Sequence, residues 1–119
     1  MKRILVIEDE APSWAKIEGI LTEAGMHASV AADGEEAVEL LRKESFDMVI
    51  SDWNMPKMGG GQVLRWMRTT PAMRRTPFVI LSDCSRPEEE AESFYCGADD
   101  YMAKPYASSE LLARVERLF

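Results

Sequence analysis

Short apolar runs that end in polar residues constrain this chain more than any other feature of its sequence. Four such runs cover residues 4–7, 48–50, 78–81 and 101–103, and each is followed at once by an acidic residue, a serine or a lysine. Runs of this length are typical of strands, and apolar residues between them recur at helical spacing. Alternating strands and helices predict a parallel sheet with helices on both of its faces.

The remaining segments extend this alternation along the whole chain. Residues 27–32 form a fifth extended stretch, which carries few large apolar side chains and is expected at the edge of the sheet. The first helix is expected to end at Gly25, and Phe94 and Tyr95 are expected to supply apolar contacts of the fourth helix. No repeat or linker interrupts five strands and five helices, so residues 1–119 are expected to form a single domain.

Two helix starts carry capping signals. Asp33 precedes the second helix and can accept a hydrogen bond from its first turn, with Glu36 placed to reach back. Ser85 and Glu88 can form a similar capping box at the start of the fourth helix, where Pro87 suits the first turn.

The composition excludes several classes of function. A formal net charge of −7 argues against direct binding to nucleic acid, which needs clustered lysine and arginine. The two cysteines, Cys84 and Cys96, form neither a disulfide framework nor a metal-binding pair. No stretch has the length and apolarity of a secretory signal or a membrane span, so we expect a cytoplasmic protein without membrane contact.

Reactive side chains follow the ends of four predicted strands. Glu8 and Asp9 follow the first run, Asp52 the third strand, Ser82 the fourth and Lys104 the fifth. In an open parallel sheet, ligands bind outside the carboxyl ends of the strands, so these residues are expected to converge there. Three carboxylates, a hydroxyl and an ammonium suit a divalent cation together with a phosphoryl group.

Asp52 is the best candidate nucleophile of this set, because it stands alone at a strand end and is followed by a turn. A carboxylate can accept a phosphoryl group and form an aspartyl phosphate. Ser82 can then donate to a phosphoryl oxygen, and Lys104 can pair with Asp52 before the reaction and with phosphate afterwards. Lys104 precedes Pro105, where a cis peptide bond is far more accessible than elsewhere.

Taken together, the motifs resemble those of bacterial two-component response-regulator receiver domains, of the kind found in chemotaxis regulators. The resemblance rests on residues 4–10 (ILVIEDE), 51–56 (SDWNMP), Ser82, 97–101 (GADDY) and 104–105 (KP). It implies an α/β fold of the (βα)5 flavodoxin-like class, with a five-stranded parallel sheet in the order 2-1-3-4-5 and helices on both faces.

The resemblance also implies the roles of the acidic residues. Asp52 would accept the phosphoryl group from a phosphohistidine of a sensor histidine kinase or a histidine phosphotransfer protein. Glu8, Asp9 and Asp52 would hold magnesium, or manganese in its place, and the backbone carbonyl of Asn54 would complete the protein ligands. Lys104 would contact the phosphoryl group together with the serine at the end of the fourth strand.

Ser82 and Tyr101 would form the switch in such a domain. The aromatic ring of Tyr101 is expected to turn inward once Ser82 moves toward the phosphoryl group. The resemblance then implies a change in the surface of the fourth helix, fifth strand and fifth helix, which signals to an effector protein or domain. It also leaves open a homodimer that forms on phosphorylation. A domain of this kind assists only its own phosphorylation and dephosphorylation, and is not an enzyme acting on an external substrate.

One departure from the family pattern and two alternatives remain. Asp83 stands where the family usually has a small residue, and we hypothesise that its charge slows phosphorylation. A receiver whose chemistry Asp83 blocks would act as an interaction module without phosphorylation. A small magnesium-dependent phosphatase with an aspartate nucleophile is the other alternative, although the haloacid-dehalogenase type expects a second aspartate where Asn54 stands.

Overall fold

The computed structural model describes residues 1–55, 57–83 and 86–119, and within them the strands form one parallel sheet. The strands are β1 (Arg3–Ile7), β2 (His27–Ala31), β3 (Met48–Asp52), β4 (Phe78–Ser82) and β5 (Asp100–Ala103). Their order is β2-β1-β3-β4-β5. The predicted α/β class and strand order are therefore confirmed, and the extended stretch predicted over residues 27–32 contains the edge strand β2 (His27–Ala31).

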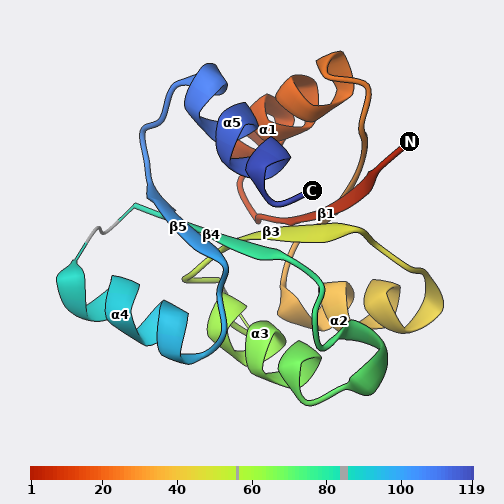
Figure 1. Ribbon diagram of the computed structural model, residues 1–119, viewed down its shortest axis with the longest axis vertical. Helices are drawn as coiled ribbons and strands as arrows, with labels where there is room; N and C mark the ends of the chain where they lie inside the picture. Colours follow the sequence, from red (N-terminus) through yellow and green to blue (C-terminus); the bar gives the residue numbers. More distant parts are fainter. Residues whose placement is uncertain (56, 84–85) are drawn as a thin grey trace.

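Helices cover both faces of this sheet (Figure 1). They are α1 (Ala11–Glu23), α2 (Gly34–Lys43), α3 (Gly60–Arg68), α4 (Pro87–Tyr95) and α5 (Ser108–Arg117), with a short 3-10 turn η1 (Pro71–Met73). α1 and α5 lie on one face, and α2, α3 and α4 lie on the other. The chain adds strands first on one side of β1 and then on the other, which places α1 and α5 on the opposite face from the rest.

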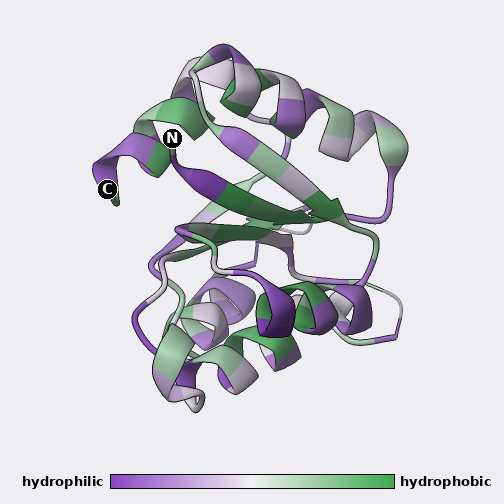
Figure 2. Cartoon of the chain, turned by 90° about the vertical axis from the view of Figure 1, so that its right-hand side faces the viewer, coloured by the Kyte–Doolittle hydropathy of each residue, from purple (hydrophilic) through white to green (hydrophobic). Residues whose placement is uncertain are grey.

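The core consists of two apolar layers that the sheet separates (Figure 2). Every residue of β3 and of β4 is buried, as expected of central strands that helices cover on both sides. On the α1 and α5 side, Ile17, Leu21, Leu111 and Val115 pack against alternate strand residues. Because side chains of a strand point alternately to the two faces, the continuous apolar runs feed both layers.

Two predicted features of helix starts are confirmed, one at α2 and one at α4. The Asp33 side chain accepts a hydrogen bond of 2.9 Å from the backbone N–H of Glu36, as predicted, and Pro87 is the first residue of α4. The expected cap at Ser85 lies outside the described residues, together with Cys84 and the expected turn at Pro56.

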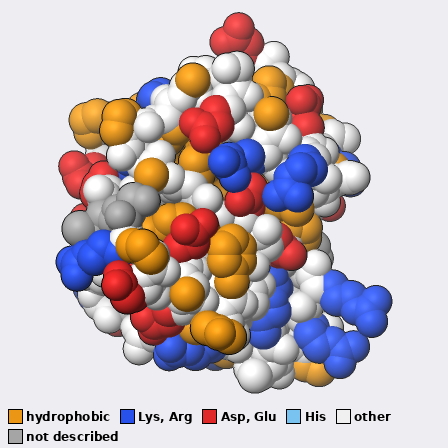
Figure 3. All heavy atoms as spheres, turned by 60° about the vertical axis from the view of Figure 1, so that its left-hand side comes forward, with side chains coloured by type: hydrophobic (Ala, Val, Ile, Leu, Met, Phe, Trp, Pro, Cys, Tyr) orange, Lys and Arg blue, Asp and Glu red, His pale blue; other side chains and the backbone are white. Residues whose placement is uncertain are grey.

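The expectation for the apolar residues of α4 was wrong. Tyr95 is 92% exposed and Phe94 is 45% exposed, so neither packs into the core. Ser93 is the buried residue of this helix. Figure 3 shows this side of the molecule, where hydrophobic side chains lie scattered among acidic and basic ones. α4 therefore packs on the sheet with little apolar area.

A close approach of backbones fixes the start of α3 beneath the end of β3. A Cβ atom at Gly60 would lie 2.5 Å from the carbonyl oxygen of Asp52 and 3.0 Å from Oγ of Ser51. The Ser51 hydroxyl donates to that same carbonyl at 2.8 Å. Only a residue without a side chain fits here, so Gly60 allows α3 to begin against the Asp52 backbone.

Arg68, the last residue of α3, joins segments that lie before the amino ends of β4 and β5. Its guanidinium donates to the carbonyl oxygens of Gly97 at 3.0 Å and Thr76 at 2.8 Å, and it pairs with Asp99 at 3.0 Å. The turn after α4 is thereby tied to α3 and to the loop that enters β4.

Across the described ranges, none of the helices combines the length and the apolar character that crossing a membrane requires.

Candidate functional site

The carboxyl ends of β1, β3 and β5 bring together two of the predicted acidic residues, Glu8 and Asp52, and the lysine. Nζ of Lys104 lies 3.3 Å from Oε2 of Glu8 and 3.6 Å from Oδ2 of Asp52. Glu8 is 1% exposed and Asp52 is 6% exposed. The Lys104–Pro105 peptide bond is cis, and the lysine side chain points toward the two carboxylates. Glu8, Asp52 and Lys104, which are far apart in sequence, thus form one charged cluster, as the strand pattern predicts.

Burial makes the charged forms of both carboxylates unfavourable. The pKa of Glu8 is raised to about 7, chiefly because burial penalises the charged form; Lys104 opposes this rise and Asp52 adds to it. Burial likewise raises the pKa of Asp52, against the opposing charge of Lys104. Burial alone would lower the pKa of Lys104, but the charges of Asp52 and Glu8 outweigh it and raise that pKa. The charged cluster is therefore short of positive charge, and a bound cation would relieve this shortage.

Glu8, Asp9 and Glu10 lie close enough to share a cation. Each contributes a carboxylate oxygen, and these oxygens lie within 4.8 Å of one another. Asp9 and Glu10 are exposed, so they can rotate toward an ion without a large desolvation penalty. Hard carboxylate oxygens of this kind suit a divalent cation such as magnesium. Glu10 was not among the predicted ligands, although it belongs to the same acidic run.

Asn54 lies in the bend that follows β3, and its residue is exposed. Together with Trp53 it lines a surface hollow of about 350 Å³ that is closed on the other side by α4 residues, including Glu88 and Glu89. The predicted metal ligand at Asn54 is a backbone carbonyl, and it is located at the same end of the sheet as Asp52.

Ser82 and Tyr101 meet at a residue that the sequence analysis missed. The Ser82 hydroxyl donates to Oε1 of Glu89, and the Tyr101 hydroxyl donates to the same oxygen at 2.8 Å. Tyr101 is 6% exposed, so its ring already lies inward. Glu89 stands in a run of three glutamates at the start of α4, where all three appear alike as favourable charges for a helix N-terminus. Only the packing of α4 distinguishes one of them.

Asp83 follows Ser82 and is exposed. Its negative charge acts on the charged cluster, because it contributes to raising both the pKa of Asp52 and the pKa of Lys104. The Asp83 charge thus influences the candidate nucleophile, as its position in the sequence suggests.

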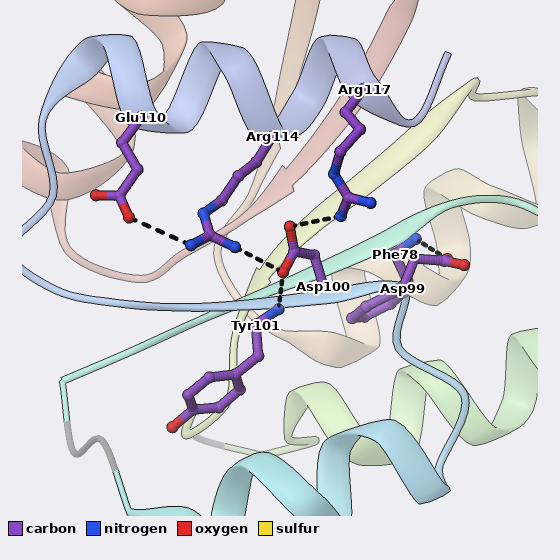
Figure 4. Close-up of polar contacts among 7 residues, drawn as sticks. All are labelled: Phe78, Asp99, Asp100, Tyr101, Glu110, Arg114 and Arg117. Atoms are coloured by element: carbon purple, nitrogen blue, oxygen red, sulfur yellow. Dashed lines mark hydrogen bonds and ion pairs between the residues drawn. The ribbon is translucent and has the colours of Figure 1, made fainter.

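Two adjacent aspartates fix β5 beside the site (Figure 4). Asp100 accepts hydrogen bonds from Arg114 at 2.9 Å and Arg117 at 3.0 Å, and from the backbone N–H of Tyr101 at 2.8 Å. Asp99 accepts a hydrogen bond of 2.8 Å from the backbone N–H of Phe78, where β4 begins. The Tyr101 backbone is therefore held against α5, while its ring extends toward α4 on the opposite face of the sheet.

Comparison with known proteins gives consistent results at the level of family. A model of the response regulator receiver domain matches residues 4–116. The cell cycle transcriptional regulator CtrA of Caulobacter vibrioides is 38% identical over 113 residues, which cover 95% of this chain and 48% of that protein. The chain thus spans about half the length of the curated relatives it matches, CtrA of Brucella ovis included.

Solved structures of similar proteins share the whole fold. The chemotaxis protein CheY4 of Vibrio cholerae has a TM-score of 0.94 and 31% sequence identity, with coverage of 100% of this chain and 99% of that chain. The receiver domain of the sensor histidine kinase PA1611 of Pseudomonas aeruginosa has a TM-score of 0.90 and 27% identity, with coverage of 98% and 96%. Its structure has a magnesium ion coordinated in the active site cleft.

Strand order, the strand-end residues and these matches agree, and the resemblance to receiver domains that the motifs carry is confirmed. The chain belongs to the response regulator receiver domain family, the signalling domain of two-component systems.

Proposed function

We propose that this chain, as one receiver domain over residues 1–119, accepts a phosphoryl group on Asp52 with the help of magnesium. The observation that carries the proposal is the buried Asp52 carboxylate, 3.6 Å from Lys104 and beside the buried Glu8. The proposed donor is a phosphohistidine of a sensor histidine kinase or a histidine phosphotransfer protein, in the cytoplasm.

In the proposed reaction, an Oδ atom of Asp52 attacks phosphorus and forms the new P–O bond. The P–N bond to the donor histidine breaks, and the imidazole nitrogen keeps its electron pair. Lys104 then pairs with an oxygen of the transferred group, since the Asp52 oxygen that it faced no longer carries a full charge. The acceptor is a side chain of the domain itself, so the chemistry is not turnover of an external substrate.

Magnesium fits the residues present, because the carboxylates of Glu8, Asp9 and Glu10 offer hard oxygen donors and the charged cluster beside them is short of positive charge. Glu8, Asp9, Asp52 and the backbone carbonyl of Asn54 would hold the ion. When bound, magnesium supplies positive charge that offsets the incoming phosphoryl oxygens. The magnesium ion in the cleft of the PA1611 receiver domain supports this assignment.

The proposed output is a change in the surface formed by α4, β5 and α5. Ser82 would leave its present partner to contact the phosphoryl group, and Tyr101 would adjust with it. α4 suits such a change because it buries Ser93 but few apolar side chains. The partner would be an effector protein or domain, or a second phosphorylated copy.

Intact-mass measurement after incubation with magnesium and acetyl phosphate tests the proposal. We expect one added phosphoryl group on the parent and none on Asp52→Ala, with no adduct when magnesium is chelated. Asp47→Ala is a matched control, because Asp47 lies at the other end of β3 and its side chain accepts from the backbone N–H of Arg3. This variant should label like the parent.

The other outcomes of this experiment identify the alternatives. An unmodified parent would overturn the proposal in favour of a module that acts without phosphorylation. Continuous hydrolysis of a phosphate ester such as p-nitrophenyl phosphate would indicate a phosphatase instead.

A further inference from the structure

The hydroxyl groups of Ser82 and Tyr101 share a single acceptor on α4. Both donate to Oε1 of Glu89, and one carboxylate oxygen has lone pairs for both bonds. The three residues come from separate elements, the end of β4, the start of β5 and the first turn of α4. A single side chain of α4 therefore contacts both residues of the proposed switch.

This arrangement differs from that of the neighbouring glutamates. Glu88 and Glu90 are exposed, and their position in the first turn of α4 is explained by the favourable interaction of acids with a helix N-terminus. Glu89 is partly buried and contacts the last residue of β4 and the second residue of β5. The hydrogen bonds of Glu89 form only when α4 packs in one particular way on the sheet. A favourable interaction with the helix dipole does not depend on that packing.

A serine hydroxyl has one hydrogen, so Ser82 cannot donate to Glu89 and to a phosphoryl oxygen at the same time. A phosphoryl group on Asp52 would also bring negative charge toward the Glu89 carboxylate, which lines the adjoining hollow. Contact between Ser82 and the phosphoryl group therefore requires that the bond to Glu89 breaks.

We infer that Glu89 is a positioning residue that holds Ser82 away from the phosphoryl site and couples its release to the first turn of α4. The inference rests on the proposed function of Asp52. Glu89 touches neither the phosphoryl group nor the metal in this scheme, and it acts through the hydroxyl of Ser82. The hydrogen bond from Tyr101 keeps the Glu89 carboxylate beside β5 when Ser82 turns away from it.

Initial rates of labelling by acetyl phosphate at saturating magnesium test this role. We expect Glu89→Ala to label about three- to tenfold faster than the parent, because a hydrogen bond to a charged group no longer restrains Ser82. Glu89→Gln retains an acceptor oxygen without the charge and should lie between the two. Glu90→Ala removes the same charge from the next residue of α4 and should stay within about twofold of the parent.

The Ser82→Ala background separates a positioning role from a general effect on charge or folding. If Glu89 acts through Ser82, adding Glu89→Ala to Ser82→Ala leaves the labelling rate unchanged. Circular dichroism of each variant confirms that it is folded, and Glu89→Gln preserves the side-chain volume if the alanine variant is unstable.

Two results would overturn the inference while leaving the proposed function intact. One is a parent that labels on Asp52 while both Glu89 variants label at the parent rate. The other is a faster labelling rate for Glu89→Ala that persists in full in the Ser82→Ala background. A parent that takes no phosphoryl group would instead overturn the proposed function, and the role of Glu89 with it.

Discussion

At the scale of single residues, the site is dominated by charge that burial makes unfavourable. Lys104 lies between Glu8 and Asp52, and all three side chains are at most 13% exposed. A buried pair of this kind contributes little net stability, but removing one member leaves an uncompensated charge. The arrangement therefore adds little to stability, and its charges are available to the proposed cation and phosphoryl group.

Asp83 adds a further negative charge that acts on Asp52, which gives a prediction for the rate of the proposed reaction. Asp83→Ala should label with acetyl phosphate about two- to fivefold faster than the parent at low ionic strength, because one repulsive charge is removed from the approach of an anionic donor. The gain should shrink as salt is added. A variant that labels no faster than the parent would contradict the hypothesis, and Glu116→Ala, an exposed acid on α5, is the charge-matched control.

Asp100 gives a prediction for the pH dependence of stability. Burial by itself would raise the pKa of this carboxyl, but hydrogen bonds from the Tyr101 N–H, Arg117 and Arg114 outweigh burial and lower it. Because the folded value lies below the unfolded value, the carboxylate contributes stability that is complete above about pH 4 and is lost as pH falls through the folded value.

Asp100→Asn should therefore lower the free energy of unfolding by about 1–2 kcal/mol at pH 7, a moderate figure because both arginines are partly exposed. The difference from the parent should become smaller between pH 4 and pH 3. Urea denaturation of both proteins across this range measures it, and a difference that does not vary with pH would contradict the assignment.

At the scale of elements, β3 and α4 differ in how firmly they are held. β3 is buried along its whole length, and its end is fixed by the start of α3. α4 buries Ser93 and leaves Phe94 and Tyr95 largely exposed. The proposed acceptor Asp52 thus lies on a firmly packed strand, while the proposed responding helix is weakly packed.

Gly60→Ala tests the close contact at the start of α3. The new Cβ would lie 2.5 Å from the Asp52 carbonyl oxygen, so α3 must shift, and we expect the free energy of unfolding to fall by about 2–3 kcal/mol. Gly19→Ala is the matched control, because this exposed position within α1 has no heavy atom within 4 Å of the added Cβ. It should be stabilising by about 0.5–1 kcal/mol. Equal effects of the two substitutions in urea denaturation would contradict the contact.

The elements and the convergence of Glu8, Asp52 and Lys104 could be predicted because both follow from local patterns. Apolar runs mark strands, and parallel topology brings their carboxyl ends together. The environment of α4 could not be predicted in this way. Phe94 and Tyr95 are apolar but exposed, and Glu89 is partly buried and hydrogen-bonded while Glu88 and Glu90 are exposed. These differences depend on how a weakly apolar helix is placed on the sheet. Sequence periodicity carries little information about such a helix.

At the scale of the whole molecule, folding concentrates negative charge at one end of the sheet, so a cation that binds only there should stabilise the folded state. We expect the unfolding temperature of the parent to rise with magnesium concentration. The free energy of unfolding should increase by about 2.7 kcal/mol when the magnesium concentration is a hundred times the dissociation constant. Asp52→Ala should show a much smaller rise, and sodium chloride at equal ionic strength provides the control. A parent that magnesium does not stabilise would contradict the proposed metal site.

The ties made by Arg68 have a geometric consequence for α4. The carbonyl of Gly97, directly after the helix, is bound to the same guanidinium as Thr76 and Asp99. At the opposite end of the helix, the Glu89 carboxylate accepts hydrogen bonds from Ser82 of β4 and Tyr101 of β5. If the hydrogen bonds to Glu89 are released, we expect α4 to rotate about Gly97. The largest displacement should then occur at the N-terminal end of α4, where Glu89 lies.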